Sequence, residues 1–190
     1  MKGMIMAGGK ATRFRHPEEK GVLEIEGRTL LERSVAALKA GGVDDISVAV
    51  THRNPRTREL AKRLGIATIE TRGEEYHQDI LELLAEQGNF ISLNVDVPFV
   101  RGSHVKKLTD AIEEHSIACV VPACVSMIKP EQDSIMIDAE GTRMLWIGLN
   151  FVTTSPETSL LVYDDPLLAI NVNTEEDLLT ARKLAKDHGL

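Results

Sequence analysis

The chain opens with a short apolar run that ends in a glycine pair and two cations: Met6-Ala7-Gly8-Gly9-Lys10-Ala11-Thr12-Arg13-Phe14. Paired glycines allow positive φ and let backbone N–H groups approach a ligand closely. Successive N–H groups of this kind form a concave site for anions, and an arginine can add bidentate contacts to a phosphate. The stretch therefore predicts a buried strand followed by a phosphate-binding loop.

Two better-known phosphate loops are excluded by the spelling of this stretch. The Walker loop has four residues between its glycines and then Gly-Lys-Ser/Thr, whereas the dinucleotide fingerprint reads Gly-x-Gly-x-x-Gly at the start of a helix. Neither pattern occurs around residues 3–14. A glycine pair after a strand is also common in ordinary turns. The residues that follow must therefore decide between a phosphate-binding loop and an ordinary turn.

Strand and helix patterns alternate along the chain beyond this loop. Apolar, β-branched runs predict strands at 3–7, 45–51, 66–70, 90–95 and 118–124. Helical spacing predicts helices at 30–40, 55–64 and 76–86 and a fourth that contains Val105, Leu108 and Ile112. Strands that alternate with helices in this way predict an α/β fold with a Rossmann-like, mostly parallel (mixed) sheet and helices on both faces.

The pattern changes in the last third of the chain. Short strands are expected at 134–138, 144–152 and 160–162, and a buried strand at 168–172. Thr174 is expected to cap a final helix, with Asp177 three residues further on. We expect a single domain over residues 1–190, in which the region of about 125–167 is a mixed β insertion that forms the acceptor side.

Composition restricts the classes of partner. The formal net charge is −7, which does not favour nucleic acid, and no segment approaches the apolar run that a bilayer span requires. The first apolar run is too short for a signal peptide, so we expect a soluble, cytoplasmic protein without a membrane partner. Cys119 and Cys124 are expected to be small core residues rather than a disulfide or a zinc site.

The residues that follow the glycine pair carry a resemblance to a known group of enzymes. Ala-Gly-Gly-x-x-Thr-Arg at 7–13, a lysine at 20, a short strand at 22–25, then Gly27 and Leu-Leu-Glu at 30–32 resemble the MobA-like nucleotidyltransferase superfamily. Asn94-Val95-Asp96-Val97-Pro98 and Asn171-Val172-Asn173-Thr174-Glu175 also fit it. The resemblance implies a nucleotide-diphospho-sugar transferase type of fold.

Within the superfamily, the last third of the chain resembles archaeal adenosylcobinamide-phosphate guanylyltransferases. The similarity lies in Gly148-Leu149-Asn150-Phe151-Val152, Asp164-Asp165-Pro166 and the ending Lys186-Asp187-His188-Gly189-Leu190. It implies transfer of GMP from GTP to adenosylcobinamide phosphate with release of pyrophosphate, and it allows a homodimer. Two alternatives stay open: a relative with another acceptor, such as molybdopterin or a sugar phosphate, and a non-catalytic nucleotide-binding module.

The resemblance also implies roles for individual residues. Arg13, Lys20 and Asp96 would be catalytic, and Mg²⁺ would be held by Asp96 and Asn173. The nucleotide would be bound by these three catalytic residues and by seven others: Ala7, Gly8, Gly9, Lys10, Thr12, Gly73 and Asp79. Three of these assignments have a plainer alternative, since Asp96 can belong to a turn, and Asp79 and Asn173 can cap helices. Trp146 either lines the acceptor pocket or belongs to the core.

The chain departs from the family pattern at three positions of the first segment. Ala11 stands where glycine or serine is usual, Arg15 where glycine is common, and Gly21 where proline often follows the lysine. These departures bear on the path of the loop, whereas the cations and glycines on which phosphate binding depends are all present.

Overall fold

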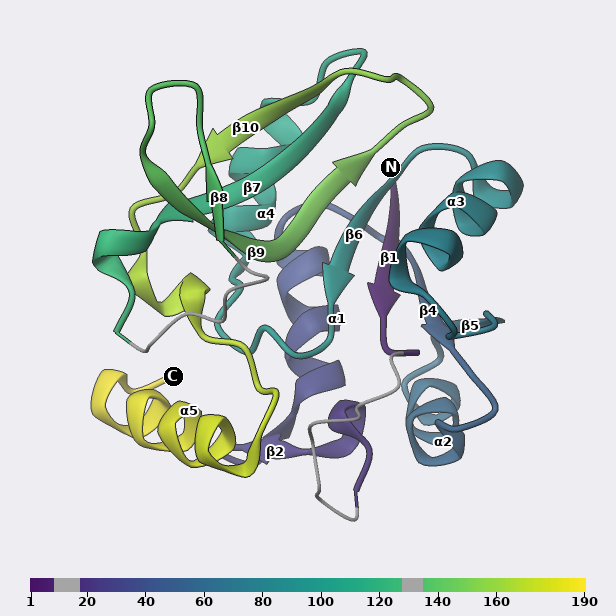
Figure 1. Ribbon diagram of the computed structural model, residues 1–190. Coiled ribbons are helices and arrows are strands. Elements are labelled where there is room, and N and C mark those ends of the chain that lie inside the picture. Colours follow the sequence, from purple (N-terminus) through teal and green to yellow (C-terminus); the bar gives the residue numbers. More distant parts are fainter. Residues whose placement is uncertain (9–17, 128–134) are drawn as a thin grey trace.

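Strand β1, the first strand of the chain, lies inside an extended mixed sheet (Figure 1). The computed structural model describes residues 1–8, 18–127 and 135–190. In these residues the sheet has the order β10-β7-β9-β6-β1-β4-β5, with β8 paired to β9. The strands are β1 (Lys2–Met6), β4 (Asp45–Val50), β5 (Ala67–Glu70), β6 (Phe90–Asn94), β7 (Ser116–Pro122), β8 (Ile135–Ile137), β9 (Arg143–Val152) and β10 (Thr158–Val162). A separate hairpin joins β2 (Glu24–Ile25) to β3 (Arg28–Thr29).

The half of the sheet around β1 is parallel. Strand β1 pairs in parallel with β4 and with β6, and β4 pairs in parallel with β5. Strand β9 runs antiparallel between β6 and β7, and β10 returns to a parallel pairing with β7. This arrangement confirms the mostly parallel, mixed α/β sheet expected from the sequence. It also places β9 inside the sheet, although β9 comes from the region expected to be an insertion.

Helices cover both faces of the sheet (Figure 1). They are α1 (Leu30–Ala40), α2 (Pro55–Arg63), α3 (Tyr76–Gln87), α4 (Gly102–Asp110) and α5 (Glu175–His188). The helices pack in two different core clusters. Apolar residues of α1, α2, α4 and α5 share the larger cluster, whereas Ile80, Leu83 and Leu84 of α3 pack with Met4, Met6 and Phe90 in the smaller one.

The helix ends follow the expected capping chemistry. The Thr174 hydroxyl accepts a hydrogen bond from the Asp177 N–H, and Asp177 accepts one from the Thr174 N–H, which completes a capping box at the start of α5. Thr29 and Glu32 form the same arrangement at the start of α1. Helix α1 ends at Ala40, before the glycine pair that was expected to stop it. No helix among the described residues is both long and apolar enough to cross a membrane.

Two expectations from the sequence were wrong. The apolar residues of 168–172 are buried, as expected, but the segment forms part of the 3₁₀ turn η4 (Pro166–Ala169) and an extended stretch rather than a strand. Asp165 causes this by accepting the Leu167 N–H and so capping the turn. Cys119 is a free, buried core residue as expected, whereas Cys124 is free but exposed, because it lies in the 3₁₀ turn η2 (Ala123–Val125) after β7 has ended.

The parallel strands place the predicted functional residues at one edge of the sheet. Since β1, β4, β5 and β6 run in the same direction, the residues that follow them emerge at their shared carboxyl edge. Gly8, Thr51, Thr71 and Asp96 each lie one or two residues beyond one of these strands. In open α/β sheets, ligands bind at this edge.

Candidate functional site

Three side chains that the sequence analysis assigned to the site meet at the carboxyl edge of the sheet. The Lys20 ammonium donates to Asp96 Oδ2 at 2.8 Å and to Asn173 Oδ1 at 2.7 Å. These partners lie 76 and 153 residues from Lys20 in the sequence, so only the fold brings them together. The side chains of Lys20 and Asp96 are 16% and 21% exposed, which leaves the cluster withdrawn from water but accessible.

Each member of this Lys20–Asp96–Asn173 cluster is held by a different element. Lys20 begins the 3₁₀ turn η1 (Lys20–Val22), and Asp96 lies two residues beyond the end of β6. The Val172 N–H donates to the Asp96 carbonyl at 2.9 Å, which ties the segment before α5 to the end of β6. The Asn173 N–H donates to Asp177 Oδ2 at 2.9 Å, so the capping box of α5 also orients Asn173.

The donor atoms of the cluster decide whether it suits Mg²⁺. One carboxylate oxygen and one amide oxygen converge on a single cationic group, the Lys20 ammonium, which serves as a stand-in cation. Mg²⁺ is commonly bound by one or two protein oxygens together with substrate phosphates and water. The described residues contain no group of three or more His, Cys, Asp or Glu side chains that could hold a metal. The residues present therefore fit the metal.

A second group of predicted residues surrounds the start of the glycine loop. Gly8 is buried, and Gly73 has φ +63°, a conformation that favours glycine. A Cβ built on Gly73 would lie 2.7 Å from the Gly8 carbonyl oxygen and 2.3 Å from Thr51 Cγ2. The structure therefore brings Gly8 and Gly73 into direct contact, and it does so at a distance that no side chain at position 73 would permit.

Asp79 supports this contact from α3. Oδ1 of its buried carboxylate accepts the Gly73 N–H at 3.1 Å, and its predicted contact with the nucleotide stays a prediction. On the other side, the Arg53 guanidinium donates to the Gly73 carbonyl at 2.7 Å. Gly73 is thus held at both its N–H and its carbonyl, and Asp79 acts on the loop rather than only on its own helix.

Thr71 was not identified from the sequence. Thr71 is 8% exposed, and its hydroxyl is a buried polar atom that has no hydrogen-bond partner within residues 1–8, 18–127 and 135–190. A Cβ on Gly8 would lie 3.1 Å from that hydroxyl. Buried polar groups are normally satisfied, so this hydroxyl next to Gly8 is a candidate for a ligand contact. The signal in the sequence was its position, since Thr71 directly follows a strand of the parallel half.

Tyr76 connects the start of α3 to the end of β6. It is the first residue of α3, and its hydroxyl donates to Asn94 Oδ1 at 3.0 Å, at the end of β6. Although half of the side chain is exposed, burial around the hydroxyl, together with the nearby Asp96 carboxylate, raises the pKa of Tyr76 to about 12. The hydroxyl therefore stays protonated at neutral pH and remains a hydrogen-bond donor in the site.

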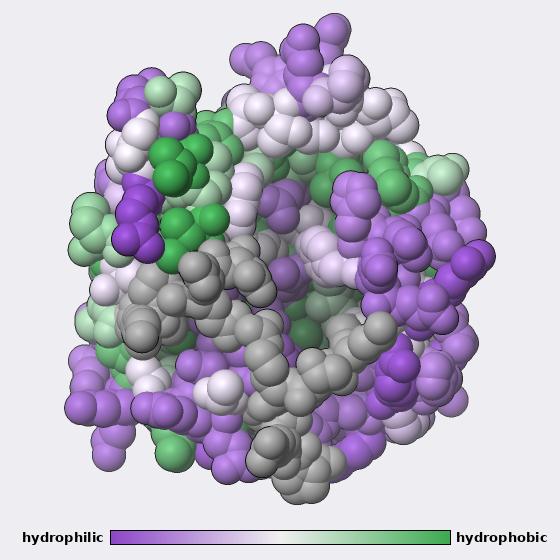
Figure 2. Space-filling model, viewed as in Figure 1, coloured by the Kyte–Doolittle hydropathy of each residue, from purple (hydrophilic) through white to green (hydrophobic). Residues whose placement is uncertain are grey.

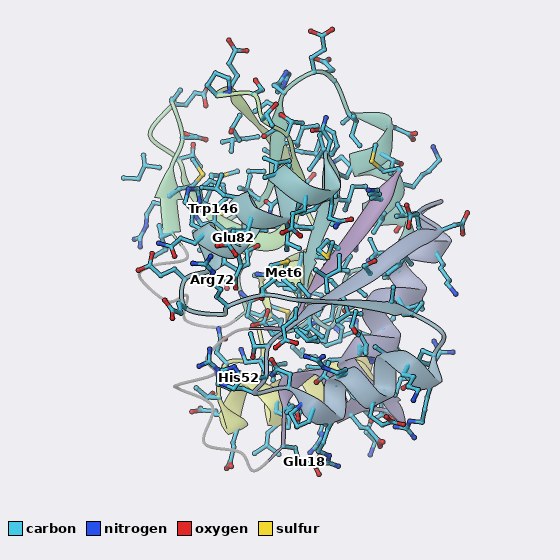
Figure 3. The ribbon with its side chains drawn as sticks, turned by 90° about the vertical axis from the view of Figure 1, so that its right-hand side faces the viewer. Met6, Glu18, His52, Arg72, Glu82 and Trp146 are labelled. Carbon is cyan, nitrogen blue, oxygen red and sulfur yellow. The ribbon has the colours of Figure 1, made fainter. Side chains whose placement is uncertain are left out.

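The sheet face beyond Tyr76 is open. Figure 2 shows a hollow on this side of the molecule, between the β8–β9 hairpin and α3. Trp146 of β9 is 38% exposed, so it is not an ordinary core residue. Figure 3 shows Trp146, Glu82, Arg72 and His52 along the same side of the molecule, and Arg72 and Glu82 form an ion pair of 3.1 Å. The open face thus carries the aromatic side chain of Trp146 on β9 and the charged pair Arg72–Glu82 at its edge.

Not every predicted residue can be placed. Gly9, Lys10, Thr12 and Arg13 lie outside the described residues, so their assigned roles stay predictions. Ala7 is described: it is buried at the end of β1, and its N–H donates to the Ala49 carbonyl at 2.9 Å. Among the predicted residues that are described, one set meets at Lys20 and the other at Gly73.

The Lys20 cluster and the glycine segment are chemically suited to hold a polyphosphate. The cluster offers an ammonium group and two oxygens of the kind that bind Mg²⁺, and it lies at the end of β6, next to β1 in the sheet. The glycine segment follows β1 and offers backbone groups in a tightly packed turn. Phosphoryl transfer depends mainly on this combination of positioning and preorganised positive charge.

Comparison with known proteins agrees with this chemistry. The chain is 26% identical to an adenosylcobinamide-phosphate guanylyltransferase of Methanocaldococcus jannaschii over the full length of both chains. It is 31% identical to the bifunctional protein GlmU of Synechococcus elongatus over 62% of the chain and 27% of that protein. The solved structure of a nucleotidyl transferase from Methanothermobacter thermautotroptrophicus matches with a TM-score of 0.68 and 16% identity over 96% of each chain, which supports the expected fold type.

The sequence model of one family covers most of the chain. The MobA-like NTP transferase domain matches residues 3–147, a range that includes the glycine segment, Lys20, Gly73 and Asp96. The chain therefore belongs to the MobA-like NTP transferase domain family and is a nucleotidyltransferase by family.

Proposed function

We propose that this protein transfers GMP from GTP to adenosylcobinamide phosphate and releases pyrophosphate. The observation that carries the proposal is the convergence of Lys20, Asp96 and Asn173 on one point beside the glycine segment. The full-length similarity to the adenosylcobinamide-phosphate guanylyltransferase of Methanocaldococcus jannaschii supports the choice of nucleotide and acceptor.

In the proposed reaction, an oxygen of the acceptor phosphate attacks the α-phosphorus of GTP. A new bond forms between that oxygen and the α-phosphorus, and the bond from the α-phosphorus to the bridging oxygen breaks. The electron pair leaves with pyrophosphate. Because two anions must meet, the largest contribution expected from the protein is positive charge fixed near the α- and β-phosphates.

Lys20 is the residue we assign to the α-phosphate. Its ammonium is already at the site, and it needs only to exchange Asp96 and Asn173 for phosphate oxygens. When bound, Mg²⁺ would neutralise phosphate charge next to the oxygens of Asp96 and Asn173. Arg13, Gly9, Lys10 and Thr12 are proposed to contact the triphosphate from the glycine loop.

The nucleoside is proposed to lie beside Gly8, Gly73 and Thr71. The Thr71 hydroxyl, which has no partner within the described residues, supports this placement, because a bound base or ribose would supply one. The acceptor is proposed to lie on the open sheet face, where Trp146 offers the apolar contact that a corrin ring requires. The Tyr76 hydroxyl lies at the border between the two regions.

A second candidate is transfer to a sugar phosphate, which the similarity to the bifunctional protein GlmU favours. A non-catalytic nucleotide-binding module is disfavoured, because Lys20, Asp96 and Asn173 are all present and in contact. The first two candidates differ in the acceptor with which GTP releases pyrophosphate, and the module releases none. One assay therefore separates the three.

The test is pyrophosphate release with GTP, ATP, CTP or UTP, each in the presence of Mg²⁺ and one of three acceptors. The acceptors are adenosylcobinamide phosphate, molybdopterin and a sugar 1-phosphate. We expect release with GTP and adenosylcobinamide phosphate, and a product whose mass equals the acceptor plus GMP less water. Release only with a sugar phosphate would establish the second candidate. Tight GTP binding without release for any acceptor would establish the module.

A further inference from the structure

Glu19, the residue before Lys20, is bound to the start of a different helix. Glu19 Oε1 accepts the Arg56 N–H at 2.8 Å, and Oε2 accepts both the Thr57 N–H and the Thr57 hydroxyl at 2.7 Å. Both oxygens are therefore engaged, and three hydrogen bonds join residues that are 37 or 38 positions apart in the sequence.

Helix α2 needs this external cap. Its own N-cap residue, Asn54, makes no side-chain hydrogen bond to the helix, because Asn54 Oδ1 accepts from the N–H and hydroxyl of Thr51 instead. Pro55 has no N–H, so Arg56 and Thr57 present the free donors of the first turn. Glu19 satisfies both donors and places its negative charge at the positive end of the helix dipole.

Gly21, on the other side of Lys20, packs against the same residue of α2. A Cβ built on Gly21 would lie 2.6 Å from Thr57 Cγ2 and 2.7 Å from Thr57 Oγ1. Thr57 is fully buried, so it has no space into which to retreat. The two neighbours of Lys20 are thus fixed to one side chain, Glu19 by hydrogen bonds and Gly21 by close packing.

The geometry points to Glu19 as a positioning residue that, with Thr57 and Gly21, holds Lys20 at the Asp96–Asn173 oxygens. This inference rests on the proposed role of Lys20. It assigns no contact between Glu19 and substrate. It also explains a departure from the family pattern, because the position after Lys20 must approach Thr57 closely and here carries glycine.

The first test measures Lys20 directly and needs no substrate. Acetic anhydride acylates the amines that it can reach, and the Lys20 side chain is only 16% exposed while its ammonium lies against Asp96 and Asn173. In Glu19→Ala and in Thr57→Val, which keeps the shape of the side chain, we expect Lys20 acylation, measured by mass spectrometry, to rise several-fold. Lys106, an exposed lysine, should not change and is the internal control. Unchanged Lys20 acylation in both variants would overturn the inference, whether or not the protein is active.

The matched control for stability is Glu32→Ala, which removes the carboxylate cap of α1. We expect it to lower the melting temperature by an amount similar to Glu19→Ala while leaving Lys20 acylation unchanged. An equal rise in Lys20 acylation in Glu32→Ala would show that general loosening, and not the Glu19 contact, exposes Lys20, and it would contradict the inference.

The second test uses a double-mutant cycle on turnover with GTP and adenosylcobinamide phosphate. Misplacement of a catalytic group by about 1 Å can cost about a hundredfold in rate. We expect Glu19→Ala to lower kcat by about tenfold to a hundredfold with little change in the KM for GTP, and to have no further effect in a Lys20→Ala background. Additive losses would contradict a role through Lys20. Absence of turnover in the unaltered protein would instead count against the proposed function, and the acylation result would still decide the role of Glu19.

Discussion

Lys20 occupies the same two oxygens that we assign to the metal. Its ammonium lies 2.8 Å from Asp96 Oδ2 and 2.7 Å from Asn173 Oδ1. A metal ion would therefore compete with Lys20 for these two oxygens. In the described structure the lysine balances the charge of Asp96. Arrival of a polyphosphate would give Lys20 a new set of oxygens and leave Asp96 and Asn173 to the metal.

This competition predicts the effect of removing the ammonium. Lys20→Met should bind Mn²⁺, used as a spectroscopic substitute for Mg²⁺, about tenfold more tightly without nucleotide, because a hydrogen bond to a charged group contributes about 1.5–3 kcal/mol. Electron paramagnetic resonance of free Mn²⁺ measures the affinity. Asp96→Ala is the control and should bind more weakly than the unaltered protein. Equal affinity in the unaltered protein and Lys20→Met would show that the lysine and the metal do not share these oxygens.

The same residue should dominate turnover. Removing one preorganised cation or donor at a reacting phosphate typically costs about a hundredfold to a thousandfold in kcat. Lys20→Ala should therefore keep its circular dichroism spectrum and lose most pyrophosphate release. Lys106→Ala, a change at an exposed lysine of α4, provides the reference. Near-normal turnover in Lys20→Ala would remove Lys20 from the site.

At the scale of elements, the loop between β5 and α3 depends on close packing around Gly73. Gly73→Ala places a methyl group 2.3 Å from Thr51 Cγ2 and 2.7 Å from the Gly8 carbonyl oxygen, in a backbone with φ +63°. Gly65 has a similar φ of +70° but open space around it. A left-handed conformation costs an alanine about 1–2 kcal/mol, and crowding adds about 1–3 kcal/mol.

We therefore predict that Gly73→Ala lowers the free energy of unfolding by more than Gly65→Ala does, by about 1–3 kcal/mol. Urea unfolding of the two variants measures this difference. Gly73→Ala should also weaken GTP binding in calorimetry, whereas Gly65→Ala should not. Equal losses of stability in both variants would mean that the contact with Gly8 carries no strain.

The start of α4 predicts a pH dependence of stability. His104 Nδ1 accepts the Arg101 N–H at 3.1 Å, which requires an unprotonated nitrogen, and Nε2 faces Asp165. Burial, followed by the charge of Arg101, lowers the pKa of His104 below its ordinary value of 6.5, despite the opposing effect of Asp165. As the pH falls through 6.5, the unfolded chain therefore takes up a proton that the folded chain resists, and stability is lost.

His104→Asn should flatten this dependence, because an asparagine oxygen can accept the Arg101 N–H but does not titrate. The measurement is the free energy of unfolding at pH 7.5 and pH 5.5 for both proteins. The loss on acidification should be smaller in the variant. A loss of equal size in both would show that His104 does not contribute to the pH dependence.

At the scale of the whole molecule, local patterns predicted the parallel half of the fold and, in the last third, strands β8, β9 and β10 and helix α5, but not the 3₁₀ turn at Pro166–Ala169. Strands β1, β4, β5 and β6 follow from apolar runs between helix stops, and their edge follows from parallel pairing. Residues 168–172 are apolar for the same reason as a strand, namely burial. The distinguishing feature is Asp165-Pro166, where the Asp165 side chain accepts the Leu167 N–H and caps the 3₁₀ turn; the apolar run alone does not distinguish the two.

The candidate site shows the same division. Lys20, Asp96 and Asn173 were predicted individually from a resemblance, and the structure adds that they touch. Thr71, Tyr76 and Glu19 were not predicted, because their roles arise from partners that are distant in sequence. Asp79 illustrates the reverse case: its acidic side chain suggested a ligand contact, whereas its observed partner is the Gly73 N–H.

The most direct measurement is a crystal structure of the protein with GTP and Mn²⁺, in which anomalous scattering locates the metal. We predict a metal ion bonded to Asp96 and Asn173, the Lys20 ammonium moved onto the α-phosphate, and the nucleoside beside Gly73 and Thr71. A nucleotide bound elsewhere, with Lys20 still paired to Asp96 and Asn173, would contradict the proposed site.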